Sequence, residues 1–338
     1  MRSTLTAILA IAFAFSVYSQ DQPKPKPKPE KKPVETFVDA AKAGVDFSLQ
    51  GEYVGELDDI KLAVQVYANG DGQFTIKMLR GGLPGAGAEM DRVRELKGKL
   101  EEGKVKFGDD KGQGVLEEGK ITATSGGREM TLKKVSRTSP TVGAKPPEGA
   151  TVLFDGKNLD GWTKPDGKTA ASWQLLDDGV MQVKGGDILS KAKFGACTIH
   201  VEFRLPFMPR ATGQGRSNSG VYVQNRYEVQ VLDSFGLKGL NNECGGIYTL
   251  AAPKVNMCLP PLAWQTYDID FTPAVFAEGK KTKNAVITVK HNGVVIHENF
   301  ELKGNCPGGM AEGADAGGIR LQDHGNPVQY RNIWVASK

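Results

Sequence analysis

Short strand-like runs separated by clear turn signals fill most of the chain and constrain its fold more than any other feature. In residues 227–233, Tyr227, Val229 and Val231 alternate with Glu228 and Gln230. Successive side chains of a strand point to opposite faces of a sheet, so the apolar residues share one face and the polar residues the other. About ten such runs after residue 150, with almost no helical periodicity, predict an all-β jelly-roll sandwich.

Turn signals divide the chain into two ordered units. Residues 34–137 contain strand-like runs joined by turns such as 69–72 (Asn-Gly-Asp-Gly), and they predict a small antiparallel β module. No constellation of titratable residues stands out there, so we expect a β-rich accessory domain of unknown function. The polar, proline-containing stretch 138–149 predicts a linker, and the second domain is expected at residues 150–338.

The N-terminus has the order of a secretory signal peptide. Arg2 precedes an apolar run from Ala7 to Tyr18 that is too short to span a bilayer, and small side chains near Ser19 favour cleavage there. We therefore expect a signal peptide at 1–19, export to the periplasm or the extracellular space, and no transmembrane segment. Residues 20–33, where proline and lysine alternate, predict an extended linker.

The distribution of charge argues against a nucleic-acid partner. The formal net charge of +4 is accounted for by residues 1–33, so the rest of the chain is formally neutral. A nucleic-acid-binding surface needs basic residues clustered on the folded part of the protein. No nucleic-acid partner is therefore expected.

Export would place the four cysteines in a compartment that permits disulfides. Four cysteines allow three pairings. Cys244 and Cys258 flank one glycine-rich region and form the favoured bridge. For Cys197 and Cys306, a second bridge and two free thiols both stay open.

Polar side chains recur at strand positions across the predicted sandwich and are expected on one side of it. The strand positions are His200, Glu202, Arg204, Tyr222, Gln224, Glu228, Gln230, Asp268, Asp270, Arg320, Gln322, Gln329 and Arg331. An outer sheet face is polar in any case, so we interpret Glu202 and Arg204 as solvated. Arg216, Asn218, Glu228, Gln230 and Arg331 lie beside glycine, asparagine and tyrosine, and amide and guanidinium groups suit sugar hydroxyls.

The loop 323–327 (Asp-His-Gly-Asn-Pro) brings His324 to the rim of the predicted sheet. Histidine is the side chain best suited to proton transfer near neutral pH. The chain contains no metal-ligand spacing of the H-x-E-x-H type and no G-x-S-x-G nucleophile motif. No cofactor is predicted, although a bound divalent metal stays open.

Several stretches taken together resemble a known family. They are 153–162, 218–223, 227–234, 246–248 and 319–333. Residues 150–338 are similar in these stretches to the 3-keto-disaccharide hydrolases, also described as 3-keto-glucoside lyase/hydratase domains. The resemblance implies a concanavalin A-like jelly roll, as in lectins and glucanases, with an oligosaccharide or glycoside substrate on its concave face.

The reaction that the resemblance implies agrees with the available residues. An ordinary glycosidase needs two carboxyl groups beside the scissile bond, and only Glu228 stands out here. A keto group at C3 acidifies the hydrogen on C2, so one base can remove that proton and hydrogen-bond donors can stabilise the enolate. The glycosidic oxygen then leaves, and addition of water completes a net hydrolysis.

Site assignments follow from this reaction. Glu228 and His324 are the predicted catalytic pair. The predicted substrate-binding residues are Arg216, Asn218, Tyr222, Gln230, Asp233, Tyr248, Gln322 and Arg331. The alternative function is a non-catalytic carbohydrate-binding or surface adhesion module that uses the same concave face.

Overall fold

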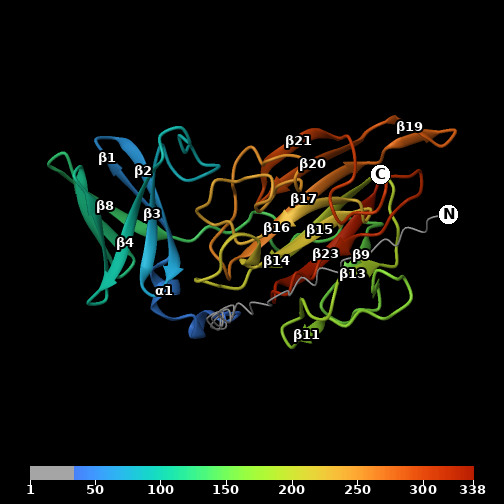
Figure 1. The fold of residues 1–338 in the computed structure, drawn as a ribbon, viewed down its shortest axis with the longest axis horizontal. Coiled ribbons are helices and arrows are strands. Elements are labelled where there is room, and N and C mark those ends of the chain that lie inside the picture. The colour runs from blue at the N-terminus through green and yellow to red at the C-terminus, as the bar shows by residue number, and fades with distance from the viewer. Residues whose placement is uncertain (1–33) are drawn as a thin grey trace, which may run out of the picture. The chain divides into compact units, whose positions relative to one another are not determined.

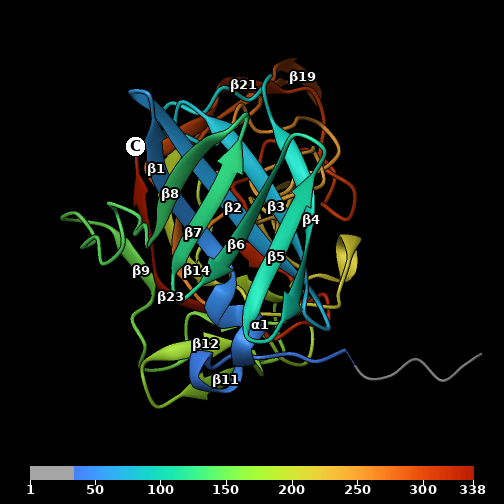
Figure 2. The ribbon, with the colours of Figure 1, turned by 90° about the vertical axis from the view of Figure 1, so that its left-hand side faces the viewer.

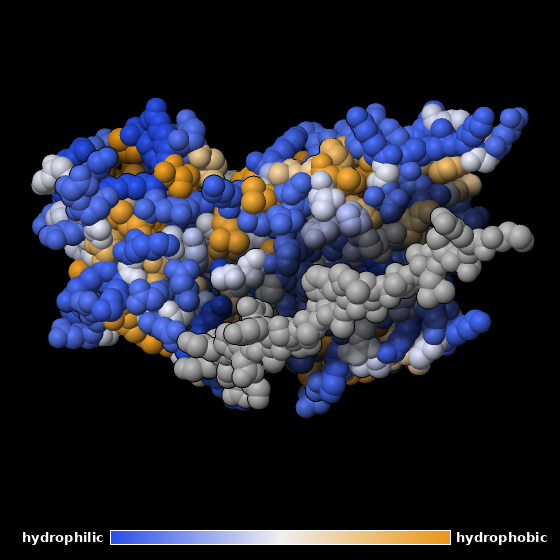
Figure 3. Space-filling view, viewed as in Figure 1, coloured by the Kyte–Doolittle hydropathy of each residue, from blue (hydrophilic) through white to orange (hydrophobic). Residues whose placement is uncertain are grey.

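The computed structural model describes residues 34–338, which are built almost entirely of antiparallel strands (Figure 1). The predicted signal peptide at 1–19 and the linker at 20–33 lie outside the described residues. Within residues 34–338, no helix has both the length and the apolar character that a membrane crossing requires. Apolar residues on the face shown in Figure 3 are scattered among hydrophilic ones. The predicted all-β fold is confirmed.

The first module is a closed eight-stranded barrel, because β8 pairs with β1 as well as with β7 (Figure 2). Two short helical turns precede it, η1 (Ala40–Lys42) and α1 (Gly44–Leu49). Its strands are β1 (Gly51–Leu57), β2 (Ile60–Gly70), β3 (Gln73–Arg80), β4 (Arg94–Glu101), β5 (Lys104–Asp109), β6 (Gly112–Glu117), β7 (Lys120–Ser125) and β8 (Arg128–Val135). Alternate residues such as Val64, Val66, Phe74 and Ile76 fill its interior. The predicted small antiparallel module is therefore confirmed.

The second module is a sandwich of a five-stranded and an eight-stranded sheet. The smaller sheet has the order β10 (Trp162–Thr163), β13 (Ile188–Ser190), β22 (Arg320–Leu321), β15 (Ser219–Val223), β16 (Tyr227–Val231). The larger has the order β11 (Gln174–Leu176), β12 (Val180–Gln182), β23 (Gln329–Ser337), β14 (Cys197–Arg204), β17 (Trp264–Thr272), β20 (Ala285–His291), β21 (Val294–Leu302), with β9 (Thr151–Phe154) on β23. A separate hairpin joins β18 (Val275–Ala277) and β19 (Lys280–Lys283), and η2 (Gly213–Gly215) precedes β15.

The main hydrophobic core lies between the two sheets. Tyr227, Val229 and Val231 of β16 belong to it, together with Ile199 of β14 and Ile269 of β17 from the larger sheet. The alternation predicted for residues 227–233 is thus confirmed. Because these side chains point inward, the intervening Glu228 and Gln230 lie on the outer face of the smaller sheet.

The expectation that the strand polar residues share one side of the sandwich is wrong. β22 and β23 follow one another in the chain, but they belong to different sheets. Arg320 therefore lies on the smaller sheet, whereas Arg331 is paired with Glu202 on the larger sheet. Alternation along a strand separates its two faces, but it does not say which sheet the strand joins.

Glu202 is also fully buried rather than solvated, because residues 139–144 cross the outer face of the larger sheet. We call these residues the strap. The backbone N–H of Gly143 donates to Glu202 Oε1 at 2.5 Å, and the Thr141 hydroxyl donates to Asp268 Oδ2 at 2.7 Å. The carbonyl of Ala144 accepts hydrogen bonds from the side chains of Asn332 and Trp334. The strap lies in the predicted linker 138–149 and is bound along most of its length.

The barrel and the sandwich each contribute residues to the core of the other. Phe207, which follows β14, belongs to the barrel core and lies 5.4 Å from Phe47 between ring centroids. Its backbone exchanges two hydrogen bonds with Phe37, at 2.9 and 2.8 Å. In the other direction, Tyr67 of β2 packs into the core of the sandwich. The buried Lys77 ammonium donates to the carbonyl of Gly236, also on the sandwich side, at 3.0 Å.

The predicted disulfide Cys244–Cys258 is absent, since all four cysteines are free and buried, and of the two alternatives left open for Cys197 and Cys306 the structure has the free thiols. Cys244 Sγ lies 3.2 Å from the Tyr267 hydroxyl, and the Cys258 thiol lies 3.7 Å from the carbonyl of Leu232. Cys197 lies in β14 of the larger sheet. Cys306 instead contacts the smaller sheet, where its Sγ accepts the backbone N–H of Glu228 at 3.2 Å.

Candidate active site on the smaller sheet

Strand register sets three functional side chains in a row on the outer face of the smaller sheet. Tyr222 of β15 is directly opposite Glu228 of β16 and, on its other side, opposite Arg320 of β22. Directly paired residues of adjacent strands have Cβ atoms about 5 Å apart, close enough for their side chains to interact. Gly220 leaves room for the carboxyl group, because a Cβ atom there would lie 2.2 Å from Glu228 Oε1.

Glu228 and Tyr222 form a buried hydrogen-bonded pair. The Tyr222 hydroxyl donates to Glu228 Oε2 at 2.7 Å, and the two residues are only 1% and 2% exposed respectively. Burial raises the pKa of Glu228 to about 7, with Arg320 lowering the pKa and Asp187 raising it further. Burial also raises the pKa of Tyr222, which stays protonated near neutral pH. The pair therefore combines a carboxyl group that titrates near pH 7 with a neutral hydroxyl donor.

Arg320 brings a guanidinium group to the same cluster. Its Cζ lies 3.7 Å from the centroid of the Tyr222 ring, within the range of a strong cation–π contact. Its Nη2 donates to the carbonyl of Gly308 at 2.8 Å, and its Nε lies 3.5 Å from Asp187 Oδ2. Asp187 immediately precedes β13 and also accepts the backbone N–H of Asp323 at 2.9 Å. The guanidinium group is thus held from three directions.

Amide side chains extend the cluster along β15 and β16. Asn218 Nδ2 donates to the carbonyl of Gln214 at 2.8 Å, and Gln230 Nε2 donates to Gln214 Oε1 at 2.9 Å. Gln322 Nε2 lies 3.5 Å from the Tyr222 hydroxyl.

Three of the six buried side-chain polar atoms that lack a hydrogen-bond partner within residues 34–338 lie in this cluster. Asn218 Oδ1, Gln322 Oε1 and Arg320 Nε are buried and have no hydrogen-bond partner within residues 34–338. The large majority of buried side-chain polar atoms in proteins are hydrogen-bonded, so three unpaired ones on one sheet face indicate a place for a polar ligand. Arg320, Gln322 and Asp187 are only partly buried, so the cluster reaches solvent on the β13–β22 side.

Some predicted site residues lie outside this cluster. Arg216 and Asp233 form a buried ion pair with each other at 2.8 Å, with Arg216 also 5.9 Å from the Tyr67 ring centroid. Arg331 lies on the outer face of the larger sheet, where it bonds Glu202 at 2.7 Å and stacks 4.1 Å from the Trp264 ring centroid. Each guanidinium group thus has a carboxylate partner away from Glu228, and the cluster does not include them.

The other predicted residues have mixed positions. Tyr248 donates its backbone N–H to the carbonyl of Glu228 at 3.0 Å and keeps a half-buried side chain. His324 is exposed in the loop between β22 and β23, next to Asp323, whose carboxylate accepts the Gly186 N–H at 2.7 Å. The cluster unites Asn218, Tyr222, Glu228, Gln230 and Gln322 of the predicted set.

Three residues of the cluster around Glu228 received no role in the sequence analysis. Asp187 and Gln214 follow no motif, and they reach the cluster through loops whose path the sequence does not reveal. Arg320 was placed on a polar face by its alternation with Gln322, but no role was assigned to it. Within residues 34–338, no group of three or more His, Cys, Asp and Glu side chains is arranged to hold a metal ion.

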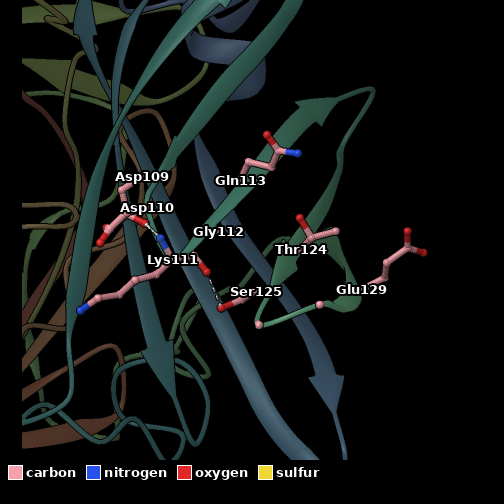
Figure 4. Close-up of a pocket in the computed structure, with 10 residues that line it drawn as sticks. Asp109, Asp110, Lys111, Gly112, Gln113, Thr124, Ser125 and Glu129 are labelled. Carbon is pink, nitrogen blue, oxygen red and sulfur yellow. Dashed lines mark hydrogen bonds between the residues drawn. The ribbon is translucent and has the colours of Figure 1, made fainter.

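A hollow of about 870 Å³ lies away from this cluster, at the ends of the hairpins β5–β6 and β7–β8 (Figure 4). Its polar side chains diverge, with Gln113 and Glu129 pointing away from Lys111. The carboxylate of Asp109 is already bound by Arg94 and by the backbone N–H of Lys111. The hollow therefore lacks the convergence of groups found around Glu228.

The cluster lies in the part of the chain that matches a known family. Residues 149–336 match the family model of the 3-keto-alpha-glucoside-1,2-lyase-like domain. A solved structure from Parabacteroides distasonis ATCC 8503, provisionally named a glycosyl hydrolase, is 37% identical, with a TM-score of 0.53 over 57% of this chain and 85% of that chain. No curated protein matches the chain.

Two further solved structures are more distant. Another Parabacteroides distasonis protein, also provisionally named a glycosyl hydrolase, is 22% identical, with a TM-score of 0.43 over 56% of this chain and 94% of that one. A carbohydrate-binding module, CBM66 from Bacillus subtilis, is 12% identical, with a TM-score of 0.32 over 52% of this chain and 96% of that one. Both are too dissimilar to support an argument about this chain.

Proposed function

Because the chain belongs to the family of 3-keto-alpha-glucoside-1,2-lyase-like domains, and is therefore a carbohydrate-active protein, we propose that it cleaves 3-keto-glycosides by net hydrolysis, with Glu228 as the general base. The observation that carries the proposal is the buried Glu228–Tyr222 pair, with its carboxyl pKa of about 7, on a face that also holds unsatisfied amide groups. A general base works best when its pKa lies near the working pH.

The proposed reaction has two stages. Glu228 takes the proton from C2, which the neighbouring C3 keto group has acidified, and the C–H electron pair forms the C2–C3 double bond of an enolate. When the enolate collapses back to the ketone, its electrons form a C1–C2 double bond and expel the glycosidic oxygen, which leaves as an alcohol after protonation. Water then adds to the enone, its oxygen to C1 and a proton to C2, and gives the 3-keto sugar.

The residues around Glu228 have matching roles in this proposal. Tyr222 is a neutral donor next to the base and is suited to deliver a proton to the leaving oxygen. Asn218, Gln230 and Gln322 are suited to bind sugar hydroxyls through their amide groups. A catalytic role for His324 stays a prediction, and its exposed loop position would require it to reach over the cluster from the rim. We also propose that the protein acts outside the cytoplasm, as its N-terminal segment predicts.

The proposal is tested with purified protein and 3-keto-trehalose or 3-keto-lactose, with the unoxidised disaccharides as substrate controls. We expect free sugar from the 3-keto substrates alone. In D₂O, the released 3-keto sugar should carry deuterium at C2, beyond the exchange measured without protein, because water addition delivers a solvent proton there. Direct hydrolysis through an oxocarbenium ion would leave hydrogen at C2 and would contradict the elimination route.

A matched pair of variants tests the base. Glu228→Gln should lower turnover by at least about a hundredfold, since general acid–base catalysis contributes ~10²–10⁴ in rate. Glu148→Gln changes an exposed glutamate and should keep the wild-type rate. Binding of 3-keto sugars without turnover would instead support the carbohydrate-binding alternative.

A further inference from the structure

Arg320 is the one cation that contacts the Glu228–Tyr222 pair within residues 34–338, and neither alternation nor family resemblance assigned it a role. Its guanidinium group stacks on the ring of Tyr222, while the hydroxyl of the same ring is bonded to Glu228. The rigid Tyr222 ring therefore lies between the Arg320 guanidinium group and the Glu228 carboxyl group and fixes their separation.

The guanidinium group also has unused donors. Of its five N–H groups, only the one on Nη2 that reaches Gly308 O makes a hydrogen bond of good geometry within residues 34–338. The Nε group is buried and has no hydrogen-bond partner there, because Asp187 Oδ2 at 3.5 Å forms an ion pair without hydrogen-bond geometry. A buried donor left unpaired has a free-energy cost, which a ligand oxygen would remove. The side chain is 11% exposed, so a ligand can reach it.

We propose that Arg320 is a catalytic residue that binds the C3 oxygen of the substrate as it becomes an enolate, and that Asp187 is a positioning residue that holds Arg320 in place. The inference rests on the proposed function. C3 is bonded to C2, so an oxyanion forms one carbon away from the atom that Glu228 deprotonates. A fixed cation in a partly water-excluded site stabilises such a developing charge without reorganising.

The stacking of Arg320 favours arginine over lysine at this position. A planar guanidinium group can stack on Tyr222 and still present in-plane N–H donors to an oxygen, whereas an ammonium group on a flexible chain would lose that orientation. Asp187 lies on the β13 side, and its second oxygen is held by the Asp323 N–H. Asp187 therefore orients Arg320 and does not itself contact the Glu228–Tyr222 hydrogen bond.

Both residues also act on the charge state of the base, which supplies a readout that a purely structural role would not move. The groups that face Glu228 are Tyr222 on β15, Arg320 on β22, Asp187 before β13 and Cys306 in the loop after β21. Arg320 lowers the pKa of Glu228 and Asp187 raises it. Removal of either charge should thus move the acid limb of the kcat/KM profile, in opposite directions.

The experiment measures kcat, KM and the pH profile of the full-length protein on a 3-keto-disaccharide. Arg320→Gln should lower kcat by about 10²–10³, as the loss of one oxyanion donor does elsewhere, and should move the acid limb to higher pH. Arg320→Lys keeps the charge, so it should return the limb close to the wild-type pH and restore part of kcat. Asp187→Asn should move the limb to lower pH with a smaller loss of kcat.

Arg92→Gln is the matched control, because this barrel arginine is 61% exposed, and it should behave as wild type. Thermal unfolding of each variant verifies folding, and Arg320→Lys keeps the test valid if Arg320→Gln is unfolded. If the wild type is active and a folded Arg320→Gln or Arg320→Lys protein keeps its full kcat, the proposed role of Arg320 is overturned. The proposed function then stays intact. Equal limbs in Asp187→Asn and wild type would overturn the role of Asp187. A wild type without turnover of any 3-keto-glycoside would refute the proposed function instead.

Discussion

Replacement of the proposed base should make the protein more stable. Burial raises the pKa of Glu228 from its ordinary value of 4.5 to about 7, so the folded protein holds this proton more tightly than the unfolded chain does. Between these two pH values the unfolded state binds fewer protons, and stability falls as the pH rises. Each pKa unit corresponds to 1.36 kcal/mol, so ionised Glu228 destabilises the fold by about 3 kcal/mol at pH 8.

Glu228→Gln removes this penalty. The glutamine side chain is neutral at every pH, has nearly the same shape and keeps an oxygen that can accept the Tyr222 hydroxyl. At pH 8 the variant should unfold about 3 kcal/mol less readily than wild type, which is a rise in Tm of about 5 °C for a folded unit of residues 34–338. At pH 5 Glu228 is almost fully protonated in the folded wild type, so the difference should shrink to about 1 kcal/mol or less.

Urea unfolding at pH 5 and pH 8, followed by tryptophan fluorescence, measures this difference. The exposed Glu148→Gln variant should match wild type at both pH values. The reasoning is refuted if the stability gain of Glu228→Gln over wild type is no larger at pH 8 than at pH 5. That result would mean that Glu228 is already compensated in the folded protein, and a pKa near 7 could then not be used to explain its role as a base.

Two other perturbations test the packing. Phe207→Ala removes a buried ring from the barrel core and should lower the free energy of unfolding by about 3–5 kcal/mol. Because barrel and sandwich share core residues, a single unfolding transition should shift. Two transitions that shift separately would contradict a shared core. Burial alone would raise the pKa of Glu202, but hydrogen bonds from His200, Asn332, Gly143 and Arg331 lower it to about 2. Wild type should therefore lose stability as the pH falls from 4.5 towards 2, and Glu202→Gln, measured by urea unfolding, should lose about 3–5 kcal/mol at pH 7 and show a weaker acid dependence.

The sequence predicted what depends on local pattern. The alternation in residues 227–233 placed Glu228 and Gln230 away from the core, and the turn signals predicted an antiparallel module before the sandwich. Glu228 could be singled out because it interrupts a run of apolar and amide residues. These features are local, since they depend only on the direction of successive side chains and on turn-forming residues.

What the sequence could not predict depends on pairing between distant segments. Arg331 and Arg320 lie eleven positions apart in similar strands, yet a crossing between sheets separates them. Arg216 and Asp233 both looked available for substrate, and only the folded chain shows that they bind each other. Asp187 had no pattern around it, because its importance comes from its proximity to a strand more than 130 residues away.

The strap affects how many outer faces of the sandwich can present free polar side chains to a sugar. A β-sandwich has two outer faces, and each could present polar side chains to a sugar chain. The strap closes part of the outer face of the larger sheet with its own backbone groups, and the carboxylates of Glu202 and Asp268 beneath it are already bonded. The unsatisfied atoms of Asn218, Gln322 and Arg320 lie on the opposite face. In the proposed function, a sugar would therefore meet unpaired polar groups on the face that carries Glu228, and self-bonded carboxylates under the strap on the other.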